Sequence, residues 1–380
     1  MTVPTSSGDL VLKAAETPEE FASAFRLLHS AYVDAGLMRP QMLKMRVTKY
    51  HLLPTTTVII AKHGDQTIGT LSIVQEGAFG LPIDKLCPRR SLFPRAHRCA
   101  EISALAVARD YRRSPGRVLF PLTKFMWEYA DKYLGLDYLF AAVNPRHAPF
   151  YEAILLFKRL KFTTKKYDFV EGNPALGEVL DIKAAHSRYR KIYSGKGADR
   201  DLYRYYTETQ HDGFHFPKTK FSRAFHGGID TDLCRLFFGG STPLVHLDDY
   251  ELELLSHLFH QTDLKEHLPL PRVTGRVRER SEIRFPVHCQ GTLTLSKGKV
   301  VPLKIIDASL NGLKATGESN LRPGDMGICV LKVGDGMSAE LKLKLVRSCA
   351  PGAYGFKVVD YSDEWKEMVN SLSYQSAKLY

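Results

Sequence analysis

The stretch Cys99–Arg113, CAEISALAVARDYRR, constrains the fold more than any other part of the sequence. Ile102, Ala104 and Ala106 lie in a short, nearly continuous apolar run, which predicts a strand covered on both faces. Glu101 lies at the start of this strand. A buried carboxylate is costly unless it is paired or used in chemistry, so Glu101 is either half of a structural salt bridge or a candidate general base.

A basic turn and a helix follow this strand. Arg109, Arg112 and Arg113 precede a Ser-Pro-Gly sequence at 114–116, and apolar residues then recur at helical spacing from Val118 to about Tyr133. A strand, a basic loop and a helix N-terminus together form a natural anion site. The alternative is that the arginines are simply solvated.

Composition limits the possible classes of protein. A chain of 380 residues is long enough for two or three domains. Its net charge of +12 favours acidic partners such as nucleic acid, anionic lipid, a nucleotide or an acidic carrier protein. The six cysteines are scattered without metal or redox spacing, so we expect no metal and a cytoplasmic location. No apolar run has the length of an integral membrane segment.

The N-terminal part predicts a helix and then a hairpin. A capping box at 17–20 with proline at the first helical position predicts a helix that ends near Gly36. Two β-branched runs, Thr56–Ala61 and Thr67–Val74, flank His63-Gly64-Asp65 and predict a hairpin beside the Glu101 strand. Residues 77–98, rich in Gly, Pro and Arg, predict a long surface excursion beside the site.

A second buried strand is predicted for Tyr138–Val143. It ends at Asn144-Pro145 and leads into a helix that carries aromatic residues, which would place Asn144, His147 and Tyr151 near the same sheet edge as Glu101. A further strand is expected from Leu176 to Ile182.

Three sequence segments carry a specific resemblance: LPIDKL at 81–86, AEISALAV at 100–107 and NPRHAPFY at 144–151. Residues 10 to 185 resemble the Gcn5-related acyltransferase superfamily and, within it, the bacterial N-acyl amino acid synthases, which are related to the acyl-homoserine-lactone synthases. The resemblance implies an α+β fold with a mixed sheet flanked by helices.

The resemblance also implies roles for individual residues. Glu101 would take the proton of the amine, a backbone N–H along the Leu105–Val107 edge would stabilise the oxyanion, and Tyr151 would protonate the leaving thiolate. Asn144 and His147 complete the expected catalytic set. Tyr151 could instead be a packing aromatic, and His147 a capping or supporting group.

The acyl donor is inferred from the loop before the helix that is predicted from Val118. Members of the superfamily that use coenzyme A have a Q/R-x-x-G-x-G/A loop, which holds the pyrophosphate. Residues 113–118 of this chain are instead RSPGRV, in which Pro115 lacks an N–H. We therefore expect a phosphopantetheine thioester on acyl carrier protein, contacted by Leu105, Val107, Arg112 and Arg113. An acyl-coenzyme A donor is the alternative.

Residues 186–271 are less informative. Basic and aromatic residues are mixed from 188 to 225, a pattern that can bind single-stranded nucleic acid, dock a carrier protein or pack as helices with charged outer faces. No RNA-binding or helix-turn-helix signature accompanies them, which makes nucleic acid an unfavoured partner. Asp248 or Asp249 is expected to cap a helix over 252–259, and 268–271 reads as a linker.

The C-terminal part has short strands and two ordered motifs. An R-x-x-x-R pair, Arg280 and Arg284, precedes D-x-S-x-x-G at 307–312. Both motifs and the tail AYGFKVVDYSDEWKEMVNSL resemble the PilZ domain, a six-stranded barrel that binds cyclic di-GMP. Arginine forks suit phosphates and guanine edges. The resemblance implies a nucleotide site formed by Arg276, Arg278, Arg280, Arg284, Asp307, Ser309 and Gly312. Glu279 replaces an arginine that many such domains carry.

The expected organisation is an acyltransferase domain (1–185), a mainly helical extension (186–271) and a PilZ domain (272–380). The expected function is fatty acyl transfer from acyl carrier protein to an amino acid or similar small amine, regulated by cyclic di-GMP. Two alternatives are an acyl-coenzyme A acetyltransferase and a non-catalytic cyclic di-GMP receptor that uses the first domain as a docking scaffold.

Overall fold

The computed structural model describes most of the two predicted domains. It covers residues 10–53, 55–76, 79–87, 97–112, 115–161, 165–167, 172–197, 200–216, 247, 284–334, 337–350 and 352–372. Arg113, Arg276, Arg278 and Arg280 lie outside the described residues, as do the expected 252–259 helix and the 268–271 linker.

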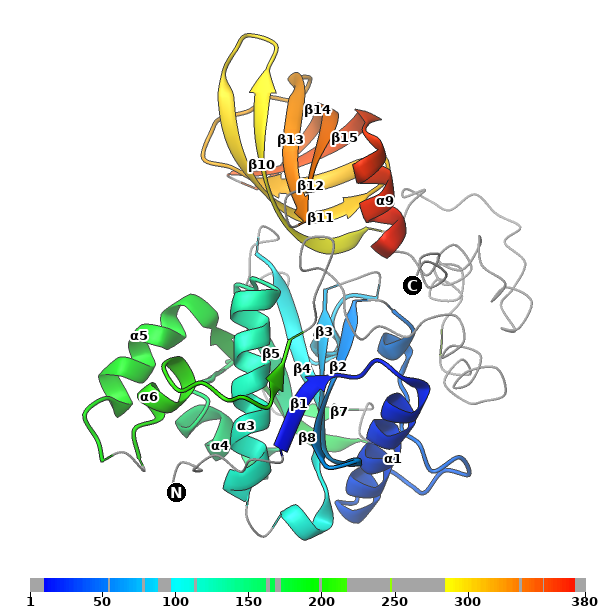
Figure 1. Cartoon of the computed structure of the whole chain (residues 1–380), viewed down its shortest axis with the longest axis vertical. Coiled ribbons are helices and arrows are strands. Elements are labelled where there is room, and N and C mark those ends of the chain that lie inside the picture. The colour runs from blue at the N-terminus through cyan, green and yellow to red at the C-terminus, as the bar shows by residue number, and fades with distance from the viewer. Residues whose placement is uncertain are drawn as a thin grey trace.

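A mixed sheet forms the N-terminal domain (Figure 1). Its strands are β1 (Leu10–Ala14), β2 (Thr56–His63), β3 (Gln66–Gln75), β4 (Cys99–Val107), β5 (Tyr138–Val143), β6 (Lys158–Arg159), β7 (Lys165–Tyr167), β8 (Asn173–Asp181) and β9 (Phe214–His215). Their order is β6-β8-β5-β4-β3-β2-β1-β9, and β7 pairs with β8. The β4–β5 and β1–β9 pairs are parallel, and the others are antiparallel.

Helices cover both faces of this sheet. Val58 and Ile60 of β2 pack in the cluster of α1 (Pro18–Asp34), whereas Ile59 and Ala61 pack in that of α3 (Pro115–Glu128). This double coverage is why β2 is apolar without alternation. A Cβ added at Gly69 of β3 would lie 2.8 Å from Val118 Cγ1, so glycine allows α3 to pack closely against β3.

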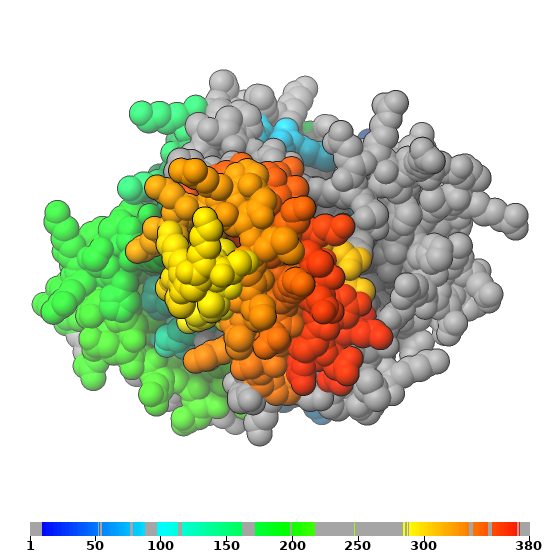
Figure 2. Space-filling view, turned by 90° about the horizontal axis from the view of Figure 1, so that it is seen from above, coloured from blue at the N-terminus to red at the C-terminus, as the bar shows by residue number. Residues whose placement is uncertain are grey.

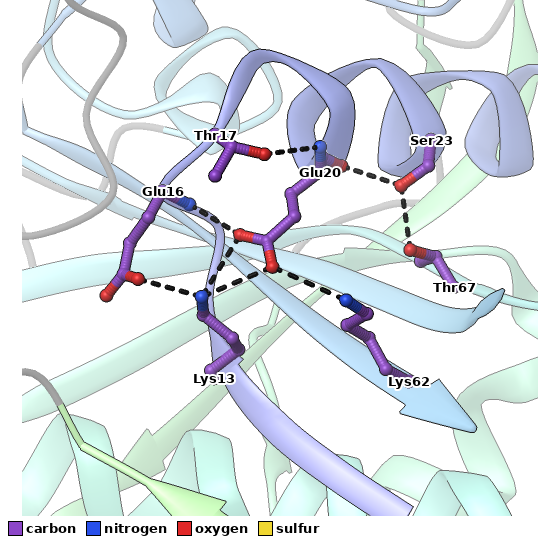
Figure 3. A network of polar contacts seen from close by, with 7 residues as sticks. All are labelled: Lys13, Glu16, Thr17, Glu20, Ser23, Lys62 and Thr67. Carbon is purple, nitrogen blue, oxygen red and sulfur yellow. Dashed lines mark hydrogen bonds and ion pairs between the residues drawn. The ribbon is translucent and has the colours of Figure 1, made fainter. Parts of the chain in front are cut away.

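The predicted helix 17–36 and hairpin are confirmed. The Thr17 hydroxyl accepts a hydrogen bond from the Glu20 N–H at 3.3 Å, and α1 ends at Asp34, two residues before Gly36, which has a left-handed φ of 68°. Glu20 also accepts from the Glu16 N–H and pairs with Lys13 and Lys62, which ties the helix to β1 and β2 (Figure 3).

Short elements complete the first domain. A π turn, η4 (Tyr129–Tyr133), continues α3, and 3-10 turns lie at η1 (Lys49–Leu52), η2 (Pro82–Lys85), η3 (Arg109–Tyr111) and η5 (Pro145–His147). The helix α4 (Ala148–Ala153) follows η5, as predicted. Within the predicted surface excursion, residues 81–83 and 86–87 are buried, so a surface location was wrong for that part.

Part of the predicted middle segment packs against the first domain. The helices α5 (Ile182–Tyr193) and α6 (Leu202–Thr207) bring Tyr189, Tyr205 and Tyr206 into the core that also contains Phe120, and β9 extends the sheet beside β1. These aromatic residues therefore serve packing rather than an exposed surface. The boundary at 185/186 stays a prediction.

The C-terminal strands form a closed barrel, which confirms the predicted six-stranded fold. Its strands are β10 (Phe285–Leu295), β11 (Val300–Ser309), β12 (Gly312–Thr316), β13 (Met326–Gly334), β14 (Met337–Ala350) and β15 (Ala353–Tyr361), in the order β10-β11-β12-β15-β14-β13. The predicted closing helix is α9 (Asp363–Leu372). It buries Trp365 completely, and the indole N–H donates to the Leu310 carbonyl at 3.1 Å.

The barrel contacts the end of the sheet where β4 begins. Arg98, directly before β4, donates to the Ile305 carbonyl of β11 at 3.1 Å and to the Gly135 carbonyl at 3.0 Å. Asp137 accepts from the Arg98 N–H and lies 3.5 Å from the Lys304 ammonium. From above, the barrel lies in front and the α5–α6 region is seen beside it (Figure 2). We call Arg98, Asp137, Lys304 and Ile305 the domain joint.

Candidate functional site

Glu101 is a buried carboxylate held by a backbone donor. Its side chain is 2% exposed, and its Oε2 accepts a hydrogen bond from the Ile83 N–H at 2.6 Å. The donor lies in η2, whose first turn is closed by the Leu81 N–H donating to Asp84 at 3.0 Å. A hydrogen bond to the charged form favours the carboxylate, which is the state that a general base needs.

The sheet opens beside Glu101. β5 pairs with β4 from Cys99↔Tyr138 to Ile102↔Ala141, although β4 continues to Val107 and β5 to Val143. The β3–β4 register shifts in the same region, and Ala104 has a left-handed φ of 59°. A bulge bends its strand and a left-handed alanine is strained, so β4 turns away from β5 at a local cost in energy. Leu105 and Val107, the predicted pantetheine edge, lie on this departing part.

Tyr32 and Arg46 lie on the Glu101 side of the sheet. The Arg46 Cζ is 4.5 Å from the centre of the Tyr32 ring, a cation–π contact. Burial raises the pKa of the Tyr32 phenol, Arg46 opposes that rise, and the negative charge of Glu101 adds to it. These two residues were missed by the sequence reasoning, because nothing local distinguishes a functional Tyr or Arg from a surface one.

His51 is neutral in this neighbourhood. Burial, together with the charge of Arg46, lowers its pKa to about 3. Its Nδ1 accepts from the Thr48 N–H at 3.0 Å, so its Nε2 carries the proton and lies 3.2 Å from the Ser72 hydroxyl. Since Ser72 pairs with Ser103, His51 supports the strand next to Glu101 rather than competing with it as a base.

Tyr151 is buried on α4, 8% exposed. Burial raises the pKa of its phenol well above the usual value, and the neighbouring Tyr32 and Glu178 raise it further. Tyr151 and Tyr32 belong to helices, α4 and α1, that lie on opposite sides of the sheet (Figure 1), and Tyr32 contributes to the raised pKa of Tyr151. The predicted acid and the predicted base are thus in one neighbourhood.

The other predicted site residues of the first domain take structural positions. The Asn144 side chain accepts from the Arg146 N–H at 3.1 Å and caps η5, while His147 is exposed. Arg112 donates to the Val107 carbonyl at 2.8 Å and pairs with Asp34 at 3.2 Å, so it links the end of β4 to α1.

The described part of the predicted nucleotide site is assembled on the barrel. Arg284 pairs with Asp307 at 3.0 Å, and a Cβ added at Gly312 would lie 2.6 Å from the Arg284 Nη2. Glycine at 312 therefore makes room for the guanidinium. The Ser309 hydroxyl is buried and donates to the Gly312 carbonyl at 3.1 Å, which shapes the turn.

The described ranges contain no group of His, Cys, Asp and Glu that could hold a metal ion. Cys87, Cys99, Cys289 and Cys329 are buried. No helix among these residues is long and apolar enough to span a membrane.

The comparisons with known proteins concern both domains. The family model described as N-acyl amino acid synthase FeeM matches residues 23–181. The solved structure of FeeM, an N-acyl amino acid synthase from uncultured soil microbes, is 25% identical, with 47% of this chain and 93% of that chain covered and a TM-score of 0.40. No curated protein matches the chain.

Two further solved structures are similar to parts of the chain. BjaI, a CoA-dependent acyl-homoserine lactone synthase, is 18% identical over 47% of this chain and 89% of its own, with a TM-score of 0.34. The PilZ domain of CeSA from a cellulose-synthesizing bacterium is 18% identical over 24% of this chain and 94% of its own, with a TM-score of 0.20.

The family match covers every predicted catalytic residue of the first domain, and the geometry unites a buried carboxylate with a buried tyrosine where two strands separate. Residues 23–181 of this chain therefore form an acyltransferase domain that is similar to the N-acyl amino acid synthases.

Proposed function

We propose that the chain transfers a fatty acyl group from a phosphopantetheine thioester on acyl carrier protein to the amine of an amino acid or similar small amine. The observation that carries this proposal is the Glu101 carboxylate, which is buried, held by the Ile83 N–H and located where β4 leaves β5. Such a group can take a proton from an amine that enters between the strands.

The proposed chemistry uses groups on both sides of this opening. Glu101 takes a proton from the ammonium, and the free amine attacks the thioester carbonyl. The oxyanion needs a donor, for which a backbone N–H on the unpaired edge of Leu105–Val107 is suitable. Tyr151 then protonates the sulfur as the C–S bond breaks, and the second proton that the attacking nitrogen must lose restores the Tyr151 phenol.

Two features favour a carrier-protein donor over coenzyme A. Pro115 begins α3 and has no N–H to offer to a pyrophosphate, and Arg112 is occupied by Val107 and Asp34. The net charge of +12 suits an acidic carrier protein. We expect kcat/KM with acyl carrier protein to exceed that with the same acyl-coenzyme A by at least about tenfold. Equal use of both donors would support the coenzyme A alternative.

The charges around Tyr32 favour an acceptor that is itself a zwitterion. Arg46 stacks on the Tyr32 ring, and the negative charge of Glu101, on β4, contributes to the raised pKa of the Tyr32 phenol. An amino acid could place its ammonium toward Glu101 and its carboxylate toward Arg46. An amino acid should therefore be acylated at least about tenfold more efficiently than the corresponding decarboxylated amine, and Arg46→Met should remove this preference.

The first test is mass spectrometry of lipid extracts from cells that overproduce the wild-type chain or Glu101→Gln. We expect a new N-acylated amine with the wild type alone, since removal of a general base typically costs about 10²–10⁴ in rate. Glu20→Gln, whose carboxylate belongs to the polar network at the start of α1, is the control and should make the product (Figure 3). The same product from both Glu101 forms would reject the assigned base, and none from the wild type would favour the scaffold alternative.

Regulation by cyclic di-GMP is the second part of the proposal. Arg284, Asp307 and Gly312 would hold a phosphate and a guanine edge, and the domain joint connects the same strand, β11, to the residue before β4. Titration calorimetry should show that Arg284→Ala weakens nucleotide binding at least about tenfold. If saturating cyclic di-GMP leaves acyl transfer by the full chain unchanged, the regulatory part fails.

A further inference from the structure

A turn between α1 and η1 exposes two large apolar side chains to solvent. Met42 is 98% exposed, more than any other large apolar side chain in the described ranges, and Leu43 is 51% exposed. Both occupy the central positions of a β-turn, because the Lys44 N–H donates to the Gln41 carbonyl at 3.0 Å. Such positions ordinarily carry Gly, Pro, Asn, Asp or Ser, so turn chemistry does not explain methionine and leucine here. Exposed apolar groups that gather in one place are typical of an interaction site.

Both sides of the turn are tied to α1. The Gln41 N–H donates to the His29 Nε2 at 2.9 Å, and the Arg46 N–H donates to the Phe25 carbonyl at 3.0 Å. The His29 nitrogen can accept only in the neutral imidazole, and burial together with the charges of Lys44 and Arg46 lowers the pKa of His29. The turn is therefore held in place while its two apolar side chains stay exposed.

The segment that contains this turn is basic. Residues 35–49 include Arg39, Lys44, Arg46 and Lys49 and no acidic residue. Arg39 and Lys44 are exposed and lie on either side of the apolar pair in the sequence. Cations around an apolar tip complement a surface that is negatively charged outside and apolar beneath, as an anionic membrane is.

The small size of the apolar tip favours a membrane over an acidic protein. A stable protein interface typically buries about 800 Å² on each partner, whereas the apolar part here is a single turn. A membrane needs no shaped counterpart, because side chains enter the lipid interface individually and binding grows with the apolar area that they bury. Two apolar side chains with neighbouring cations are therefore sufficient for lipid.

We propose that Met42 and Leu43 insert into the interface of an anionic membrane, with Arg39 and Lys44 close to the lipid headgroup phosphates. The contact is peripheral, and it depends on these side chains and not on acyl transfer.

The use of this contact rests on the proposed function. Arg46, two residues after Lys44, stacks on the Tyr32 ring, and the charge of Glu101 acts on the same phenol. The segment that touches lipid thus continues into the acceptor side of the site. An amino acid that carries a fatty acyl chain is an amphiphile, and a membrane beside the site would take it up.

The test is sedimentation of the full chain with vesicles of phosphatidylcholine alone or of equal parts phosphatidylcholine and phosphatidylglycerol. The wild type should bind the anionic vesicles at least about tenfold more tightly than the neutral ones. The double variant Met42→Ser, Leu43→Ser should bind the anionic vesicles at least about tenfold more weakly, because it loses two apolar side chains from the lipid. A wild type that ignores anionic vesicles, or a double variant that binds like it, would overturn the inference.

Two variants serve as controls. Ile328 and Val330 on β13 are about as exposed as Leu43, and Ile328→Thr, Val330→Thr should bind within about twofold of the wild type, since threonine suits a strand. Lys44→Gln keeps the apolar pair and should weaken binding to the anionic vesicles alone, by about fivefold. A loss in the β13 variant as large as in the turn variant would contradict a contact through the turn.

Leu43→Trp locates the contact directly. The two natural tryptophans, Trp127 and Trp365, are buried, so an indole at 43 should account for any quenching by lipids with brominated acyl chains. We expect its emission to shift to the blue and to be quenched in anionic vesicles that contain these lipids. A vesicle-bound variant without quenching would place the lipid contact elsewhere and overturn the inference.

Other occupants of the tip would give different results. If acyl carrier protein bound there, the double serine variant would raise the KM for the carrier protein in assays without vesicles. If a second copy of the chain bound there, the wild type would sediment as a dimer and the variant as a monomer. Either result without vesicle binding would reject the membrane contact.

Vesicle binding also separates this inference from the proposed function. A wild type that binds anionic vesicles through the turn but makes no N-acylated product would reject the proposed function and leave the membrane contact established. A wild type that makes the product but does not bind the vesicles would reject the inference alone.

Discussion

The Ile83 backbone N–H donates to the carboxylate of Glu101, the proposed base, at 2.6 Å. Ile83→Pro removes this donor. Because a hydrogen bond to a charged group typically contributes about 1.5–3 kcal/mol, its loss should lower kcat/KM at least about tenfold. Ile83→Ala truncates the side chain but keeps the N–H, so it is the matched control. Equal kcat/KM for the two variants would contradict this role.

Glu178 should also leave a signature in stability. Its folded pKa of about 7 exceeds the unfolded value near 4.5, so the folded state binds more protons between these values and loses stability as pH rises through 7. Glu178→Gln should therefore unfold at higher urea than the wild type at pH 8, by on the order of 2 kcal/mol, with little difference at pH 4. A difference independent of pH would contradict a protonated Glu178.

The first turn of α1 is held to the sheet by ion pairs and hydrogen bonds between side chains. Lys13, Glu16 and Glu20 form a network around the first turn, and Ser23 reaches Thr67 of β3 at 2.7 Å (Figure 3). These contacts anchor the first turn of α1 to β1 and β3.

Thr17→Ala should lower the free energy of unfolding by about 1 kcal/mol, because the Glu20 N–H loses its cap. Thr17→Ser keeps the hydroxyl and should behave as the wild type in urea titrations. Stability that is unchanged in Thr17→Ala would exclude the cap.

The ion pair of Glu20 should make stability depend on pH. Burial acts to raise the pKa of Glu20, but the Glu16 N–H and Lys13 lower it. The contribution of Glu20 to the free energy of unfolding is therefore present at neutral pH and is lost as pH falls below about 4.5.

The two domains meet through a buried polar joint. Arg98 is 4% exposed, and its guanidinium spans Gly135 and Ile305. Asp137 has a lowered pKa despite its burial, because it accepts from the Arg98 N–H and lies near Lys304 and Lys183. A shift of β11 on nucleotide binding would thus act on the segment that leads directly into Glu101.

Lys304→Met should weaken this coupling. The ammonium lies 3.5 Å from Asp137 and is partly exposed, so its loss should not unfold the barrel. We expect cyclic di-GMP affinity within about twofold of the wild type, but a reduced effect of the nucleotide on acyl transfer, since coupling energies are typically about 1–3 kcal/mol. Lys344→Met, on β14, is a matched control. An unchanged nucleotide effect in Lys304→Met would show that coupling does not pass through the joint.

Much of the fold follows from local sequence pattern. The Thr17 cap, the hairpin and the buried strand that begins near Glu101 depend on neighbouring residues, because periodicity and turn chemistry act over a few positions. The six-stranded barrel was expected from the resemblance to the PilZ domain, which also implied one site that contains both Arg284 and Asp307, and these two side chains pair.

What the sequence by itself determined is therefore the set of elements and the identity of Glu101 and Tyr151 as candidates. Only the tertiary structure decided that the Ile83 N–H donates to Glu101, that Glu178 is completely buried, and that Arg98 reaches Ile305. These properties depend on strand order, on the register of β8 against β5 and β6, and on the packing of the barrel. Desolvation and contacts between residues distant in sequence set the charge of a side chain, and neither can be predicted from its neighbours in the sequence.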